Sequence, residues 1–80
     1  MAPHDIVSPL PGTFYRRPSP EAAFYVAIDS AVQAGAIIGL VEVMKQFTEI
    51  EASVSGRVME LLVEDGEPVD AGQVLMRIEE

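Results

Sequence analysis

Residues 49–59, EIEASVSGRVM, repeat the pattern of residues 5–15, DIVSPLPGTFY, which stand 44 positions earlier in the chain. Both stretches begin with an acid and Ile, continue with a small residue, and then carry Gly and a large apolar residue at matching spacing. A second pair, VQAGAIIGLVE at 32–42 and VDAGQVLMRIE at 69–79, matches at a distance of 37 positions. Unrelated β-proteins share turn residues, but two ordered matches across nearly the whole chain favour an internal repeat. We therefore predict two similar halves related by a pseudo-twofold axis.

Short apolar runs alternate with turn residues along both halves, and Gly-containing pairs such as Asp65-Gly66 mark the turns. Four of the runs read as strands: 36–43, 47–54, 58–63 and 74–78. The best helix candidate, residues 21–28, is short and follows a proline, so it does not hold three well-capped turns. The pattern predicts one all-β domain, residues 1–80, with about eight short strands.

The apolar positions supply the expected core. Its candidates are Phe14, Phe24, Val32, Ile38, Val41, Val58, Leu62, Val69, Val74 and Ile78. Met59 and Met76 are expected to fill gaps in that core because their side chains are flexible. Five glycines are expected at turns that need an unusual φ: Gly12, Gly35, Gly56, Gly66 and Gly72.

The composition excludes several classes of protein. The chain has no Cys, which excludes disulfides and thiolate metal sites and suits a reducing cytoplasm. No apolar run approaches the ~20 residues that span a bilayer. The net charge of -8 would repel nucleic acid and anionic membrane surfaces, so we expect neither as a partner. No nucleophile has a base beside it, and His4 lies in a terminal stretch expected to fray, so we predict no catalytic and no metal-binding residue.

The two repeat distances differ by seven residues, which places an insertion in the first half between residues 15 and 28. That region contains Arg16-Arg17-Pro18-Ser19-Pro20. Its two prolines stiffen the backbone and remove two amide donors, which suits a protruding loop rather than a paired strand. Loop insertions cost little stability, so a neutral insertion is an equally good interpretation of these residues alone.

Lys45 is the only lysine and lies between the two repeated halves, with strand patterns on both sides. We predict that Met44 and Lys45 lie at the tip of a hairpin, whose register the sequence leaves open. A two-residue loop would pair Val43 with Gln46 and Glu42 with Phe47, which mixes apolar and polar residues on each face. Such turns favour Asn-Gly or Asp-Gly, because both central residues need positive φ. An ordinary solvated lysine is the alternative, but poor turn chemistry at an exposed tip points to function.

Residues 42–46, EVMKQ, resemble the acceptor motif Glu-Ala-Met-Lys-Met of the biotinyl domain, the biotin carboxyl carrier module of biotin-dependent carboxylases. The resemblance runs from Ile6 to Ile78 and includes SPLPGTFY, SVSG and DGEPV. Residues 17–22, RPSPEA, are similar to the "thumb" of the carrier subunit of bacterial acetyl-CoA carboxylase, which places a thumb at about residues 16–25. Two departures, Val43 for Ala and Gln46 for Met, imply slower modification or a matched ligase.

The resemblance implies a flattened β-barrel or sandwich of two four-stranded antiparallel sheets. It also implies biotin joined to Lys45 by a biotin protein ligase, and a non-catalytic swinging arm that carries a carboxyl group from biotin carboxylase to a carboxyltransferase. The reaction would be that of acetyl-CoA carboxylase, which forms malonyl-CoA for fatty acid synthesis, or of a related acyl-CoA carboxylase. The residues implied in ligase recognition are Glu42, Val43, Met44 and Gln46, and those implied in contacting biotin from the thumb are Arg17, Pro18, Ser19, Pro20, Glu21 and Ala22.

Two other functions stay open at this point. A lipoyl carrier domain of a 2-oxoacid dehydrogenase type complex shares the architecture and the hairpin lysine, although that family usually has Asp-Lys-Ala at the tip. An unmodified β-sandwich adaptor would need no prosthetic group. The chain could be an excised domain or a compact free-standing carrier.

Overall fold

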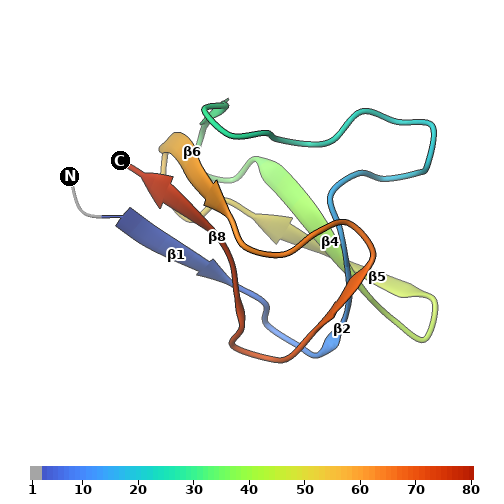
Figure 1. Cartoon of the computed structure of the whole chain (residues 1–80). Coiled ribbons are helices and arrows are strands. Elements are labelled where there is room, and N and C mark those ends of the chain that lie inside the picture. The colour runs from blue at the N-terminus through green and yellow to red at the C-terminus, as the bar shows by residue number, and fades with distance from the viewer. Residues whose placement is uncertain (1–2) are drawn as a thin grey trace.

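In the computed structural model, which describes residues 3–80, every regular element is a β-strand. Residues 1–2 of the predicted 1–80 domain lie outside the described part. The strands are β1 (Pro3–Val7), β2 (Gly12–Tyr15), β3 (Ala31–Val32), β4 (Ile37–Val43), β5 (Gln46–Glu51), β6 (Gly56–Leu61), β7 (Glu67–Val69) and β8 (Val74–Glu79). They form two four-stranded antiparallel sheets, ordered β1-β8-β6-β3 and β5-β4-β2-β7 (Figure 1). The all-β prediction is confirmed, and residues 21–28 form no helix. No helix between residues 3 and 80 is long and apolar enough to cross a membrane.

The strand order confirms the internal repeat. Exchanging β1 with β5, β2 with β6, β3 with β7 and β4 with β8 converts each sheet into the other. The same exchange carries the β4–β5 hairpin onto the paired strands β8 and β1, where the two ends of the chain lie. Figure 1 shows the start of β1 and the end of β8 on one side of the barrel and the β4–β5 hairpin on the opposite side. The predicted insertion forms the long connection from β2 to β3, which projects on the hairpin side.

The core lies where the two sheets meet and includes side chains from both, such as Phe14 of β2 and Ile78 of β8, each 0% exposed. Three core predictions are wrong, and a fourth predicted core residue, Val74, is only half-buried and lies outside the core cluster. Phe24 lies in the projecting connection and is exposed, and Leu62 is exposed just beyond the end of β6. Met59 is exposed where the register of β6 shifts between Val58 and Glu60, whereas Met76 is buried as predicted. His4 is not in an unpaired terminal stretch, because it belongs to β1 and pairs with Ile78 of β8.

The five predicted turn glycines fall into two groups. Gly35, Gly66 and Gly72 have the positive φ that was expected. Gly12 and Gly56 do not, and they begin the equivalent strands β2 and β6 instead. A Cβ at Gly12 would collide with the carbonyl oxygen of Glu42, and one at Gly56 with that of Glu79. These two glycines are therefore needed for close strand approach, at matching places in the two halves.

Replacing Gly56 by Ala is expected to lower the free energy of unfolding by about 1–3 kcal/mol, because β6 must move away from the backbone at Glu79. Urea denaturation followed by circular dichroism measures this change. Ser53→Ala, at a nearby exposed position, is the control and should stay within about 0.5 kcal/mol of the wild type. Equal midpoints for Gly56→Ala and the wild type would contradict the close approach.

Candidate functional site

The hairpin between β4 and β5 has Met44 and Lys45 at its tip, as predicted, and the structure settles its register as a two-residue turn. Val43 pairs with Gln46, and the intervening Met44 and Lys45 have φ values of 50° and 67°. Two consecutive positive φ values define a type I′ turn, whose right-handed twist matches the flanking strands. Each residue with a side chain costs about 1–2 kcal/mol in this conformation, so Met-Lys is a strained choice. Both side chains are exposed, Met44 to 90%, which leaves the lysine amine accessible to another protein.

Glu42 holds this turn from within the hairpin. One of its carboxylate oxygens accepts a hydrogen bond from the backbone N–H of Lys45 at 3.1 Å. The other accepts one from the hydroxyl of Tyr15, on β2, at 3.2 Å. The hydrogen bond to Glu42, together with burial and the nearby carboxylates of Glu42 and Asp65, raises the pKa of Tyr15 above its usual value. The neutral hydroxyl therefore donates at neutral pH, and the bond is lost only as the pH rises through that raised pKa.

Removing this acceptor should loosen the turn. In Glu42→Ala the Lys45 amide loses its partner, so we expect it to exchange with solvent about fivefold faster and the domain to lose about 1 kcal/mol of stability. Hydrogen exchange measured by NMR reports the first change and urea denaturation the second. Glu49→Ala, which removes an exposed carboxylate from β5, is the matched control. If both variants exchange at the wild-type rate, Glu42 does not hold the turn.

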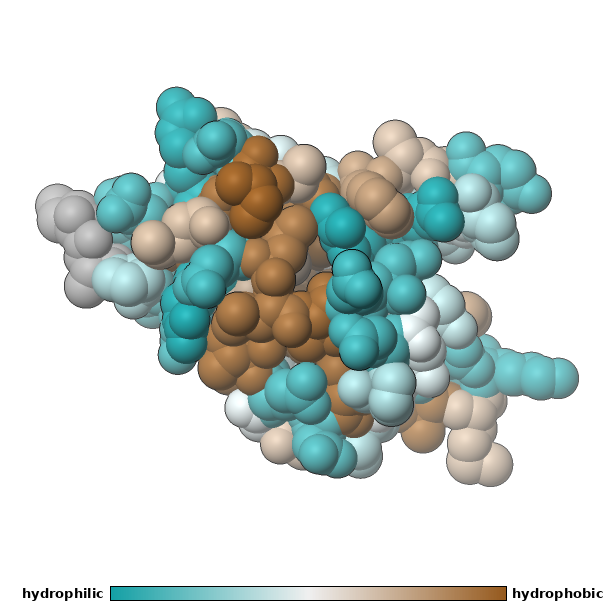
Figure 2. All heavy atoms as spheres, in the orientation of Figure 1, coloured by the Kyte–Doolittle hydropathy of each residue, from teal (hydrophilic) through white to brown (hydrophobic). Residues whose placement is uncertain are grey.

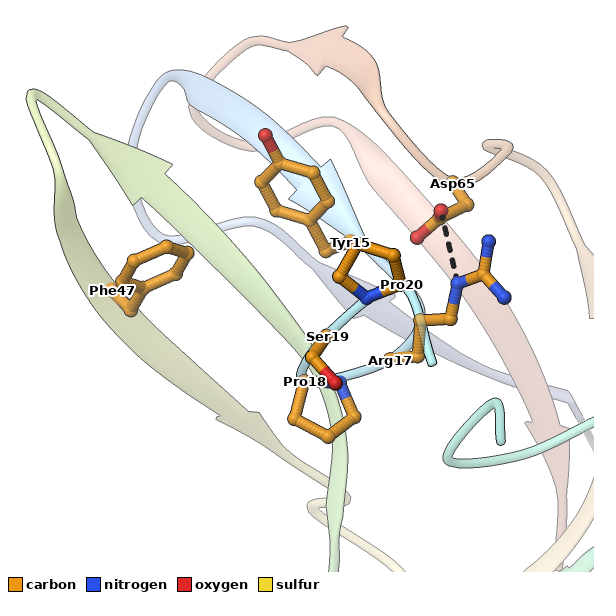
Figure 3. A pocket seen from close by; sticks show the side chains of 7 residues that line it. All are labelled: Tyr15, Arg17, Pro18, Ser19, Pro20, Phe47 and Asp65. Atoms are coloured by element: carbon orange, nitrogen blue, oxygen red, sulfur yellow. Dashed lines mark ion pairs between the residues drawn. The ribbon is translucent and has the colours of Figure 1, made fainter. Parts of the chain in front are cut away.

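A cavity of about 280 Å³ lies beside the hairpin. Its lining residues are Tyr15, Arg17, Pro18, Ser19, Pro20, Phe47 and Asp65. Figure 3 shows the rings of Tyr15 and Phe47 facing the Pro18–Pro20 segment, with the Arg17 side chain directed to Asp65. The two aromatic rings lie 6.3 Å apart between centroids, and Phe47 follows the lysine by two positions on β5. Mostly apolar walls with a few polar groups suit a small organic ring.

The structure brings the predicted site residues together unevenly. Four of the six thumb residues, Arg17 to Pro20, line the cavity, whereas Glu21 and Ala22 do not. The predicted hairpin residues 42–46 are not part of the lining. Tyr15, Phe47 and Asp65 also line the cavity, although they were not among the predicted site residues. No group of three or more His, Cys, Asp or Glu side chains that could hold a metal ion occurs within residues 3–80.

Comparison with known proteins gives a consistent result. The sequence model of a family described as "Biotin-requiring enzyme" matches residues 4–78. The chain is 47% identical over 74 residues to the biotin carboxyl carrier protein of acetyl-CoA carboxylase from Nostoc sp., covering 92% of this chain and 41% of that protein. It is 46% identical over 71 residues to the protein of the same name from Pseudomonas aeruginosa, covering 89% of this chain and 46% of the relative. The chain thus spans less than half the length of these two relatives.

Solved structures agree with the fold. The crystal structure of the Kluyveromyces lactis urea carboxylase superposes with a TM-score of 0.79 at 26% identity, over 99% of this chain and 6% of that one. A single-chain, multi-domain long-chain acyl-CoA carboxylase superposes with a TM-score of 0.78 at 22% identity, over 98% of this chain and 7% of that one. In both proteins the matching part is a small fraction of a much larger chain.

Proposed function

Because the chain belongs to the family of biotin-requiring enzymes, we propose that it carries covalently attached biotin on the Nζ atom of Lys45. The observation that carries the proposal is the placement of the only lysine at the exposed tip of a strained type I′ turn. The residues fit such a group, since the amine is accessible and the cavity beside the hairpin has apolar walls.

Bound biotin would supply a ring nitrogen that accepts and releases a carboxyl group, and the protein would supply position. The long lysine arm keeps the ring at a high effective concentration near each partner active site. By analogy with the named relatives, those partners are a biotin carboxylase and the carboxyltransferase of acetyl-CoA carboxylase. We place no catalytic group on this chain, and we place the protein in the cytoplasm.

The biotin protein ligase would bind at the hairpin before the biotin is attached. Of the residues near Lys45, Met44 and Gln46 are exposed and Val43 is half-buried, so a ligase can contact all three. Glu42 would act through the shape of the turn, because both of its carboxylate oxygens are engaged inside the protein. After modification, the thumb residues that line the cavity, Arg17 to Pro20, would contact the biotin ring when the arm folds back.

The deciding experiment presents the protein separately to a biotin ligase and to a lipoyl ligase, each with ATP and its own acid, followed by intact mass. We expect one biotinyl increment and no lipoyl increment. Transfer of lipoate alone would assign the domain to the lipoyl carriers. No increment with either ligase would instead favour an unmodified adaptor.

A further inference from the structure

The thumb, residues 16–25, belongs to no strand, so pairing within a sheet does not fix its direction. Two of its hydrogen bonds only close the thumb on itself. The Tyr25 amide donates to the Arg16 carbonyl at 2.8 Å, and the Ala22 amide donates to the Ser19 carbonyl at 3.1 Å. The returning limb of the thumb, residues 21–25, leads back to the barrel and is anchored just beyond the thumb, where Val26 is buried in the core. The outgoing limb, residues 16–20, carries the thumb residues that line the cavity and needs an anchor of its own.

Asp65 provides that anchor from the turn between β6 and β7. Its Oδ1 atom accepts a hydrogen bond from the Arg16 backbone N–H at 2.7 Å, and its Oδ2 atom lies 3.6 Å from Arg17 Nε. Figure 3 shows this second contact as an ion pair at the edge of the cavity. The turn is itself fixed, because the Gly66 amide donates to the Phe14 carbonyl at 2.7 Å. One carboxylate therefore holds two consecutive residues where β2 ends and the thumb begins.

The two arginines also join the limbs of the thumb. The guanidinium carbon of Arg16 lies 4.0 Å from the centroid of the Phe24 ring, and that of Arg17 lies 4.9 Å from it. Arg16 further donates to the Val26 carbonyl at 3.1 Å. Cation–π contacts of this kind stabilise a ring that would otherwise be exposed, which explains why Phe24 lies outside the core. Fixing the outgoing limb at Asp65 thus fixes the returning limb as well.

We propose that Asp65 is a positioning residue that holds the thumb beside Phe47 of the β4–β5 hairpin and keeps the cavity between the thumb, Tyr15 and Phe47 in shape. The proposal rests on the proposed function only in taking the biotin ring as the occupant of that cavity. The Arg17 ion pair cannot do this alone, because its side chains are 35% and 26% exposed and exposed pairs contribute little. The short, partly buried bond to the Arg16 amide is the main contact.

NMR relaxation of the unbiotinylated chain tests the proposal directly. In the wild type we expect order parameters of about 0.85 at Ser19, Glu21 and Ala22, and in Asp65→Ala we expect values below about 0.6. Asp65→Asn keeps an oxygen that accepts from the Arg16 amide, so it should restore thumb order. Asp70→Ala removes the same charge from the exposed β7–β8 turn and should leave the thumb unchanged. Wild-type order parameters in Asp65→Ala would overturn the proposal.

A second measurement decides the question even where Asp65→Ala does not fold. The Arg16 amide of the wild type should exchange with solvent at least about tenfold slower than an unbonded amide of the same sequence, since Asp65 accepts from it. Unprotected exchange at Arg16 would also overturn the proposal. Both readouts precede biotin attachment, so failure to biotinylate the wild type would defeat the proposed function without affecting either result.

Discussion

Lys45→Arg is expected to remove biotin attachment completely and to leave the barrel folded. The guanidinium of Arg stays protonated in proteins, so it cannot offer the neutral nitrogen that attacks an activated carboxyl group. Arg has similar length and charge, and the position is exposed, so the turn should tolerate it within about 0.5 kcal/mol. Because Lys45 is the only lysine in the chain, no other side-chain amine can replace it.

Intact mass after incubation with biotin, ATP and a biotin ligase measures this result. The wild type should gain one biotinyl increment and Lys45→Arg none, while their circular dichroism spectra coincide. Carboxylation by the assembled enzyme should be lost in parallel. An increment on Lys45→Arg equal to that of the wild type would show that the attachment site lies elsewhere.

Phe14→Ala should have the largest effect on stability. Phe14 lies in β2, between β4 and β7, and its ring is fully buried in the core. The packing against β4 is close, because a Cβ at Gly39 would lie 2.6 Å from the Phe14 ring. Truncating a buried Phe typically costs about 3–5 kcal/mol. Native proteins have only about 5–15 kcal/mol of stability, and a short chain lies at the low end.

Urea denaturation of Phe14→Ala and Phe47→Ala gives a matched comparison, since both changes remove one phenyl ring from the same sheet. Phe47 is 59% exposed, so its truncation should cost less than about 1 kcal/mol. Phe14→Ala should unfold at a far lower urea concentration or be largely unfolded without urea. Similar midpoints for the two variants would contradict the central role of Phe14 in the core.

The twofold organisation of the fold was predictable, because a repeated sequence pattern implies that the two halves of the chain fold alike. Once the segment at 49–59 matches that at 5–15, strand pairing in one half implies pairing in the other, and the turn at Met44 and Lys45 falls between them. The register of the hairpin and its type I′ geometry were not predictable from the residues, because Met-Lys is poor turn chemistry and the pairing of Val43 with Gln46 mixes apolar and polar residues on each face.

The wall of the cavity was not predictable in the same way. Asp65 and Arg16 are 49 residues apart, and Asp65-Gly66 reads locally as an ordinary turn. Phe24 was expected in the core because hydrophobicity alone does not distinguish a buried ring from one covered by guanidinium groups. The hydroxyl of Tyr15 meets Glu42 only because β2 and β4 are neighbours in the sheet.

The exchange symmetry of the two sheets has a practical use in protein engineering. It places the β4–β5 hairpin opposite the paired strands β1 and β8, in a molecule whose longest dimension is 37 Å. Figure 2 shows the hairpin and the thumb as separate projections at the end away from the termini. A fluorescent protein or affinity handle fused to either terminus would emerge at the far end and leave Lys45 accessible. With biotin on Lys45 as proposed, the domain would serve as a compact tag that attaches fusion proteins to streptavidin surfaces in one orientation.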